Sequence, residues 1–240
     1  MMLTMEGKKV LVTGASRGIG ALIAHAFANY GAKVIGTRTT ATDAIDGPCT
    51  EWLNSDFSDL SQLYDCATEV KAIAPDVLIN NAGINKVGEF TKIDPEEFLH
   101  IQQVNVFAPF LLCQSVIPSM RNHKWGRIVN ISSIWGQIGK EFRASYSTSK
   151  FALDGMTLAI AAEHSHNGIL ANCVAPGFTD TELTRRVLGE EEIRNISAMV
   201  PIHRMAKPKE IASFVAWLAS DENTYITGQN ITIDGGFTRV

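Results

Sequence analysis

The stretch KKVLVTGASRGIG, residues 8–20, joins a short apolar strand pattern to a glycine-rich turn and the start of a helical pattern. Its glycines, Gly14, Gly18 and Gly20, are spaced Gly-x-x-x-Gly-x-Gly. They allow a tight turn and a close backbone approach to a pyrophosphate, which the N–H groups and dipole of a helix N-terminus stabilise. The spacing differs from Gly-x-Gly-x-x-Gly, and no Walker-type Gly-Lys-Ser/Thr follows. Such a turn is also a common plain strand–helix connection, so its weight depends on the surrounding sequence.

The rest of the chain repeats this alternation of short apolar runs with longer stretches of helical period. Nearly continuous apolar runs are typical of strands covered on both faces. The pattern predicts βαβ units and an α/β fold with a doubly wound, Rossmann-like parallel sheet, as one domain over residues 1–240. The expected strands are Lys8–Thr13, Lys33–Thr37, Glu51–Asn54, Val77–Asn80, Arg127–Ile131, Leu170–Val174 and Asn230–Ile233. The expected helices are Ile19–Tyr30, Leu60–Ile73, Pro95–Met120 (as two helices), Ser147–Ser165 and Pro208–Ala219, with starts at Asp59, Asp94 and Lys207.

Composition excludes several classes of protein. The 240 residues are 45% hydrophobic and 19% charged, with a formal charge of -4, which argues against disorder and against non-specific binding to nucleic acid or an anionic membrane. Four scattered cysteines without a Cys-x-x-Cys pair indicate reduced thiols rather than disulfides or a zinc site. Residues 1–9 lack a signal-peptide pattern, and the longest uncharged stretch, Phe98–Met120, is interrupted by polar residues. We therefore expect a cytoplasmic protein with no membrane span.

Arginines occupy two places that matter for a nucleotide. Ligands of such a sheet bind beyond the carboxyl ends of its strands, and Arg38 follows the second strand, where an NAD site usually has an acidic residue. An arginine there can pair with a 2′-phosphate, and Arg17 in the glycine turn would add a second charge. Either arginine alone is equally well explained as a solvated surface residue, but the two together favour NADP(H). Asp56 could accept a hydrogen bond from the adenine amino group or cap the next helix, although Asp59 is better placed as a cap.

Tyr146 and Lys150 stand four residues apart at the start of a helical stretch, so they share one helix face. A tyrosine hydroxyl has an ordinary pKa of about 10 and needs a nearby cation to act as an acid–base group at neutral pH. Lys150 could be that cation. The pair occurs often by chance and is weak evidence alone.

Several motifs in register identify the chain as similar to the short-chain dehydrogenase/reductase family, over essentially its whole length. Within the family it most resembles bacterial 3-oxoacyl-carrier-protein reductases and related carbonyl reductases. The motifs are Thr13–Gly20, Asn80-Asn81-Ala82-Gly83, Asn105, Ser133, Tyr146-x-x-x-Lys150, Pro176-Gly177, Tyr225–Gly228 and Asp234–Gly236.

The resemblance implies a role for each of four catalytic residues. Tyr146 would protonate the carbonyl oxygen, and Lys150 would lower the pKa of Tyr146 and bind the nicotinamide ribose. Ser133 would hold the carbonyl oxygen; Ser132 is an equally good hydroxyl, and only the family register selects its neighbour. Asn105 would anchor a water that links Lys150 to solvent, although a buried amide satisfying a helix carbonyl explains it too.

The resemblance also implies a set of NADP(H)-binding residues and no catalytic metal. His164 and His166 are two apart on an expected helix and so do not form a metal pair. Thr179 stands where relatives usually have Ile or Val, which should matter little because that contact is made by backbone. The set comprises Gly14, Ser16, Arg17, Gly18, Ile19, Gly20, Arg38, Asp56, Phe57, Asn81, Ala82, Gly83, Tyr146, Lys150, Pro176, Gly177, Thr179 and Thr181.

Substrate specificity is expected from the loop at about 182–205 and from residues after the fifth strand. Trp135, Gln137, Phe142 and Met199 are candidates for a pocket, but Trp135 and Phe142 fit an interface or a core equally well. Relatives that act on acyl carrier protein commonly have basic residues before the fifth and sixth strands. Lys124 meets the first condition, whereas Asn167 stands at the second, so half of this docking signal is missing.

The resemblance implies an NADPH-dependent reductase of a small ketone substrate, with 3-oxoacyl thioesters and acyl carrier protein as candidate partners. An alcohol or sugar dehydrogenase working in the oxidative direction is the alternative. A non-catalytic cofactor-binding regulatory protein is a third reading, although such relatives would be expected to lose the tyrosine or the lysine. The resemblance further implies a homotetramer built through the Pro109–Met120 and Ser147–Ser165 helices.

Overall fold

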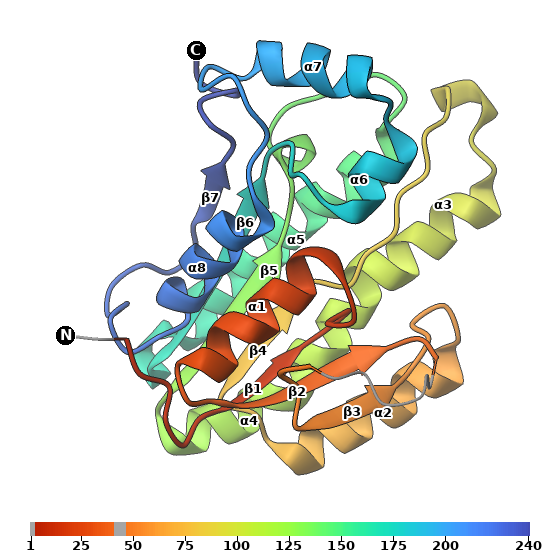
Figure 1. Ribbon diagram of the computed structural model, residues 1–240. Helices are drawn as coiled ribbons and strands as arrows, with labels where there is room; N and C mark the ends of the chain where they lie inside the picture. The colour runs from red at the N-terminus through yellow and green to blue at the C-terminus, as the bar shows by residue number, and fades with distance from the viewer. Residues whose placement is uncertain (1–2, 41–46) are drawn as a thin grey trace.

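The computed structural model describes residues 3–40 and 47–240, and these form a seven-stranded parallel sheet with helices on both faces (Figure 1). The strand order is β3-β2-β1-β4-β5-β6-β7, so the chain winds outward from β1 in one direction and then, from β4 onward, in the other. The doubly wound Rossmann-like fold expected from the sequence is confirmed. The strands are β1 (Lys9–Val12), β2 (Lys33–Arg38), β3 (Glu51–Asn54), β4 (Val77–Asn80), β5 (Gly126–Ile131), β6 (Ile169–Pro176) and β7 (Asn230–Ile233).

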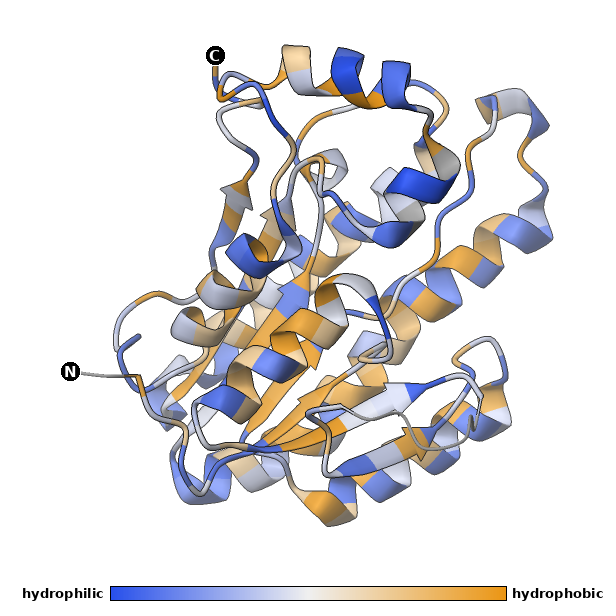
Figure 2. Cartoon of the chain, viewed as in Figure 1, coloured by the Kyte–Doolittle hydropathy of each residue, from blue (hydrophilic) through white to orange (hydrophobic). Residues whose placement is uncertain are grey.

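Two hydrophobic clusters hold the helices to opposite faces of the sheet. Val10 and Val12 of β1 point to the face covered by α1 and α8, and Leu11 between them points to the face covered by α2, α4 and α5, since successive strand side chains alternate. Figure 2 shows hydrophobic residues concentrated in the central strands. The helices are α1 (Gly18–Asn29), α2 (Leu60–Ile73), α3 (Pro95–Gln102), α4 (Ala108–His123), α5 (Ala144–His164), α6 (Glu182–Val187), α7 (Glu190–Met199) and α8 (Pro208–Leu218).

The helix starts at Asp59 and Asp94 are confirmed, and each has a physical cause. Asp59 Oδ1 accepts hydrogen bonds from the N–H groups of Ser61 (2.9 Å) and Gln62 (3.3 Å), and Asp94 caps α3, which has Pro95 in its first turn. Asp59, rather than Asp56, is thus the cap of α2. These caps fix where the connections after β3 and β4 end.

Three segments differ from the sequence expectation. The helix α5 begins at Ala144 rather than at Ser147, and Ser145 in its first turn is buried. A π-helical turn, Gln103–Phe107, separates α3 from α4. The expected substrate loop contains two short helices, α6 with six residues and α7 with ten.

Candidate active site

The glycine turn after β1 has the backbone geometry that the sequence requires. Gly14 (φ +63°) and Gly18 (φ +61°) lie in the left-handed region, which glycine adopts without steric cost. A Cβ at Gly20 would overlap the Gly14 carbonyl oxygen and the amide nitrogen of Asn81. The turn therefore packs closely under the first turn of α1, and only a glycine fits at its third position.

The N-terminus of α1 is open to a ligand. Arg17 occupies the N-cap position with extended backbone, and no side chain caps the helix. The first N–H groups of a helix have no intrahelical partner, and together with the helix dipole they attract an anion. Ser16 and Arg17 are exposed beside this end, and Ile19 is partly buried.

Asn81 ties the end of β4 to the glycine turn. Its Nδ2 donates to the carbonyl oxygens of Thr13 (2.9 Å) and Gly14 (3.2 Å). In return, Thr13 Oγ1 accepts from the backbone N–H groups of Asn81 and Ala82, both at 2.9 Å. Asn81 thus positions the turn through its side chain, and Ala82 packs against Gly14. The role of Thr13 was not expected from the sequence; a hydroxyl directly before the first glycine is the only signal for it.

Arg38 is the last residue of β2 and is partly buried. Its Nε donates to Asn54 Oδ1 at 2.7 Å, and its guanidinium carbon lies 5.2 Å from the centre of the Trp52 ring. Neither of these two neighbours is indicated by a sequence pattern. Asp56 Oδ1 accepts from the backbone N–H (2.9 Å) and the hydroxyl (2.7 Å) of Ser58, in a local turn followed by α2.

Phe57 follows Asp56 and is buried in the core beneath α2. Its backbone carbonyl accepts from Gln103 Nε2 at 2.9 Å. The residues after β3 are thereby attached to the π-helical turn between α3 and α4.

Lys150 lies under Tyr146, one turn further along α5. It is 4% exposed, and its Nζ donates to the carbonyl oxygen of Ile131 at 2.8 Å, at the end of β5. The same nitrogen is 5.4 Å from the centre of the Tyr146 ring. Burial penalises the charged form and lowers the pKa of Lys150 to about 8. The site therefore holds a cation against the tyrosine in a region with little water.

Burial also raises the pKa of Tyr146 above its ordinary value, while a hydrogen bond from Ser133 and the positive charge of Arg143 act in the opposite direction. This differs from the expectation that Lys150 lowers the pKa. The largest cause is burial, which outweighs the effects of Ser133 and Arg143, while the ammonium of Lys150 is bound to the Ile131 carbonyl.

The structure distinguishes the two serines after β5. Ser132 Oγ donates to the backbone carbonyl of Lys150 at 3.3 Å and is covered by α5. Ser133 begins the short 3-10 turn η3 (Ile134–Gly136); its Oγ accepts from the N–H of Trp135 at 3.2 Å, and its neighbourhood lowers the pKa of Tyr146. Of the two hydroxyls, that of Ser133 shares the site with the tyrosine.

Asn105 is 1% exposed in the π-helical turn. Its Oδ1 accepts from the N–H of Ile84 (2.8 Å), and its Nδ2 donates to the carbonyl of Ile84 (2.9 Å) and to Ser149 Oγ (3.0 Å). A Cβ at Gly83 would lie 3.3 Å from Asn105 Oδ1 and 3.7 Å from Lys150 Nζ, so the three residues are neighbours. Since the Asn105 amide is used by protein groups, a water bound there would contact its backbone.

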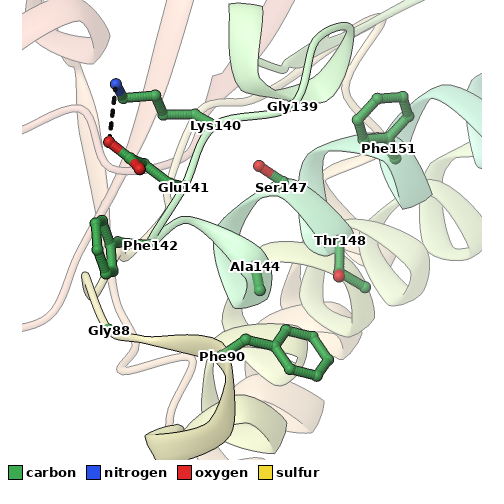
Figure 3. A pocket seen from close by; sticks show the side chains of 10 residues that line it. All are labelled: Gly88, Phe90, Gly139, Lys140, Glu141, Phe142, Ala144, Ser147, Thr148 and Phe151. Atoms are coloured by element: carbon green, nitrogen blue, oxygen red, sulfur yellow. Dashed lines mark ion pairs between the residues drawn. The ribbon is translucent and has the colours of Figure 1, made fainter.

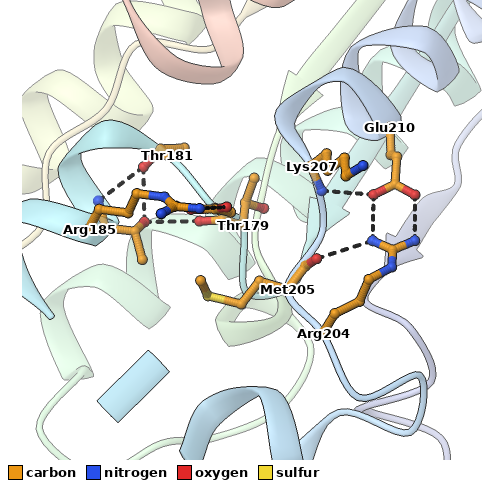
Figure 4. A network of polar contacts seen from close by, with 9 residues as sticks. Thr179, Thr181, Arg185, Arg204, Met205, Lys207 and Glu210 are labelled. Carbon is orange, nitrogen blue, oxygen red and sulfur yellow. Dashed lines mark hydrogen bonds and ion pairs between the residues drawn. The ribbon is translucent and has the colours of Figure 1, made fainter. Parts of the chain in front are cut away.

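The segment after β6 is fixed by short polar contacts (Figure 4). Gly177, after Pro176 at the strand end, donates its N–H to the carbonyl of Ile233 at 2.9 Å. Thr179 Oγ1 donates to the carbonyl of Gly177 at 3.1 Å, and Thr181 Oγ1 caps α6 by accepting from the N–H of Thr184 at 3.1 Å.

The segment 182–205, expected as the substrate loop, starts and ends at the same place. Asp180 donates its N–H to the carbonyl of Ala206 (2.8 Å), and the N–H of Ala206 donates to the carbonyl of Phe178 (2.8 Å). Paired hydrogen bonds join Arg185 to Asp180 (both 2.6 Å) at the first end. A second such pair joins Arg204 to Glu210 (both 2.7 Å) at the other end (Figure 4). The two ends of the segment that contains α6 and α7 are therefore joined by hydrogen bonds.

Two candidate substrate residues are held by neighbouring protein groups. Trp135 packs edge-to-face on Phe178 (centroids 6.1 Å apart) and Phe237 (6.2 Å), which favours its reading as part of an aromatic cluster. Gln137 donates to the carbonyl of Asn230 (2.9 Å) and accepts from Thr232 Oγ1 (2.6 Å). The amide of Gln137 therefore ties η3 to β7.

Phe142 has a positive φ of +63° and is 49% exposed. It lines a cavity of about 600 Å³ beside the N-terminus of α5 (Figure 3). Neither Tyr146 nor Ser133 lines this cavity, so it is not the site of the tyrosine. Met199, the fourth candidate, is exposed at the end of α7. The cavity is lined by Gly88, Phe90, Gly139, Lys140, Glu141, Phe142, Ala144, Ser147, Thr148 and Phe151.

Two features are absent from residues 3–40 and 47–240. In these ranges no three His, Cys, Asp or Glu side chains gather so that they could hold a metal ion. No helix in the same described part of the chain is long and apolar enough to cross a membrane.

Comparison with known proteins finds matches over almost the entire chain. The model of a family described as enoyl-(acyl carrier protein) reductase matches residues 14–238. A 3-oxoacyl-(acyl-carrier-protein) reductase of Vibrio cholerae is 36% identical, with 98% of both chains covered. The enzyme of the same name from Escherichia coli K12 is 38% identical over 99% of this chain and 100% of the relative. A solved structure titled a putative NAD(P)-dependent gluconate 5-dehydrogenase from Beutenbergia cavernae, with bound NADP at low occupancy, has a TM-score of 0.91, 32% identity and 99% coverage of both chains.

Proposed function

The chain belongs to the short-chain dehydrogenase/reductase family, and we propose that it is an NADP(H)-dependent ketoreductase in which Tyr146 gives a proton to the carbonyl oxygen of a small substrate. One observation carries the proposal. Tyr146 lies beside Ser133 and over the buried Lys150, whose Nζ donates to the Ile131 carbonyl at the carboxyl end of β5.

The residues present fit a dinucleotide with a 2′-phosphate. The glycine turn leaves no room for a Cβ at Gly20, and α1 begins without a side-chain cap, so a pyrophosphate can approach the backbone. Arg38 and Arg17 would hold the 2′-phosphate. When bound, the nicotinamide supplies the hydride. The other proposed contacts are Gly14, Ser16, Gly18 and Ile19 at the pyrophosphate, Asp56 and Phe57 at the adenine, Asn81, Ala82 and Gly83 along the cofactor, Tyr146 and Lys150 at the ribose, and Pro176, Gly177, Thr179 and Thr181 at the nicotinamide.

The protonated form of Tyr146 is the one that a reduction needs. A phenol whose pKa is raised by burial keeps its proton at neutral pH, as the proton donor of a reduction must. Ser133, which lowers the pKa of Tyr146, lies beside the tyrosine and would orient the substrate carbonyl. Lys150, with a pKa of about 8, is mostly protonated at neutral pH and stabilises the phenolate formed after proton transfer. A water on the backbone of Asn105 would return the proton to this pair from solvent.

Replacement of Tyr146 by Phe tests this assignment. The variant should lose turnover by a factor of about 10²–10⁴, the usual contribution of a positioned proton donor, while it binds NADPH almost as well as the wild type. Steady-state NADPH oxidation gives the first quantity, and fluorescence titration gives the second. A variant that retains turnover would exclude Tyr146 as the donor.

One observation favours a second function, oxidation of an alcohol or sugar. The solved structure with a TM-score of 0.91 is titled as a putative gluconate 5-dehydrogenase. A substrate panel separates the two readings: acetoacetyl thioesters, simple ketones and keto-sugars with NADPH, and gluconate and related polyols with NADP⁺. A non-catalytic regulatory role predicts no turnover with any of them.

Acyl carrier protein is a candidate partner because curated relatives are named for it. Lys124 and Asn167 are brought together in the structure, since a Cβ at Gly168 would overlap the Lys124 carbonyl. The resulting surface has one basic side chain at these two positions. We expect acetoacetyl-carrier protein and acetoacetyl-coenzyme A to be reduced with similar KM, and a KM at least tenfold lower for the carrier protein would establish the docking role.

A homotetramer would cover apolar side chains on α4 and α5. Phe110, Phe151 and Leu158 are each about half exposed. A groove of about 510 Å³ runs between α3, α4 and α5. Light scattering tests the assembly, and a monomeric mass would exclude it. The groove is lined by Leu99, Gln102, Gln103, Val106, Phe107, Phe110 and Met156.

A further inference from the structure

The guanidinium of Arg38 is held from two sides by residues of the neighbouring strand. Arg38 ends β2 and pairs in register with Asn54 of β3. Its Nε donates to Asn54 Oδ1 at 2.7 Å, and its guanidinium carbon lies 5.2 Å from the centre of the Trp52 ring, which is within the range of cation–π attraction. Both neighbours come from β3, two residues apart and therefore on the same side of that strand.

The Trp52 ring is itself fixed in place. A Cβ at Gly36 would lie 2.7 Å from this ring and 3.0 Å from the Cβ of Ala15. The indole therefore packs into the space that the missing side chain of Gly36 leaves, between β2 and the glycine turn. A ring fixed at this point gives the arginine a rigid surface beside the proposed cofactor site.

The contact with Asn54 uses the Nε of Arg38 and leaves its terminal nitrogens for a ligand. In residues 3–40 and 47–240, neither terminal nitrogen of Arg38 makes a hydrogen bond or ion pair. These two N–H groups form the fork that binds a phosphate with parallel hydrogen bonds. Asn54 is neutral, so it orients the fork without cancelling its charge.

We propose that Asn54 and Trp52 are positioning residues that aim Arg38 at the 2′-phosphate and thereby set the preference for NADP(H) over NAD(H). This inference rests on the proposed function, because it needs a cofactor with a 2′-phosphate. A free arginine side chain loses much conformational freedom when it binds a phosphate, and here that loss has already occurred in the protein.

The test compares two small ligands that differ at one phosphate, adenosine 2′,5′-bisphosphate and 5′-AMP, by calorimetric titration of the full-length protein. Asn54→Leu removes the hydrogen-bond acceptor at similar side-chain volume. It should lower the affinity for the bisphosphate about five- to tenfold and the affinity for 5′-AMP less than about twofold. Asn54→Asp keeps the shape and adds a negative charge, so it should weaken the bisphosphate by about a hundredfold. Trp52→Leu should act like Asn54→Leu, and Trp52→Phe should restore most of the affinity.

The outcomes separate this inference from the proposed function. If the wild type binds both ligands equally, or Arg38→Ala does not lower its affinity for the bisphosphate, the proposed NADP(H) site fails. If Arg38→Ala no longer prefers the bisphosphate to 5′-AMP but Asn54→Leu still does, the proposed NADP(H) site is supported and the positioning role of Asn54 is refuted. Equal weakening of both ligands in Asn54→Leu would also refute it, because a residue that only supports the fold affects both. The same ratio in KM for NADPH and NADH provides a second readout.

Discussion

The buried ammonium of Lys150 should contribute a pH dependence to the free energy of unfolding. The substitution Lys150→Met should abolish that contribution. Lys150 is 4% exposed, and its pKa is about 8 rather than 10.5 because burial penalises the charge. Lys150→Met keeps an unbranched apolar side chain at the same place and abolishes the titration. The informative quantity is the free energy of unfolding of the variant minus that of the wild type, followed as a function of pH.

The sign follows from proton binding. The folded pKa of Lys150 lies below that of the unfolded chain, so between about pH 8 and 10.5 the unfolded state binds more protons and wild-type stability rises with pH. At about pH 7 the folded protein carries a cost of about 3 kcal/mol for this lysine, and at about pH 9.5 the cost is about 1 kcal/mol. The difference between variant and wild type should therefore fall by about 2 kcal/mol over this range, whatever Met costs through the lost bond to Ile131.

Urea denaturation at both pH values, at one protein concentration, measures this difference. Lys209→Met, at an exposed position on α8, is the matched control for the loss of one lysine. If the difference in the free energy of unfolding between Lys150→Met and the wild type stays constant with pH, burial does not lower the pKa of Lys150. The explanation of its pKa would then be wrong.

Three further substitutions test local features. Gly20→Ala should lower NADPH affinity and cost about 1–3 kcal/mol of stability, because the added methyl overlaps the Gly14 carbonyl; thermal denaturation that matches the wild type would contradict this. Thr157→Val should cost about 1–3 kcal/mol in urea denaturation, since Thr157 Oγ1 accepts from Asn130 Nδ2 (2.8 Å) in the core, whereas Thr157→Ser should cost less. Phe142→Gly should raise the free energy of unfolding by about 1 kcal/mol, because a φ of +63° is unfavourable for phenylalanine; a loss of stability would mean that the ring contributes more than the strain.

The strands could be predicted from the sequence because parallel strands covered on both faces are apolar throughout. The expected Arg127–Ile131 strand, for example, became Gly126–Ile131. The helices α6 and α7 could not be found in this way. In α7 only Ile196 is buried, and ten residues that begin with three glutamates offer too few apolar positions to tell a helix from a solvated loop.

Adjacent serines show where sequence reasoning reaches its limit at the site. Ser132 and Ser133 have the same chemistry, and at the end of a strand successive side chains point in opposite directions. The two differ only in that Ser132 faces the backbone of α5, whereas Ser133 reaches Tyr146. Which side α5 occupies is a property of the packed fold, so the serine can be chosen only from the structure or from a family register.

The pKa of Tyr146 is a second such case. The four-residue spacing to Lys150 establishes that the two are near each other, but the direction of the pKa shift depends on exclusion of water and on where the ammonium points. Burial is the largest cause of the raised pKa, and burial cannot be deduced from the spacing. The spacing alone therefore could not give the sign.

The role of Arg38 also depends on contacts that the sequence does not show. A sequence with 21 positive and 25 negative residues does not show which arginine is a solvated surface group and which is held for a ligand. In the structure the distinction rests on Asn54, sixteen residues further along the chain, which meets Arg38 only because β2 and β3 pair in this register. A shift of one residue would turn the Asn54 amide to the other face of the sheet and release the guanidinium. The cofactor preference proposed for this protein is therefore determined by strand pairing as much as by the arginine itself.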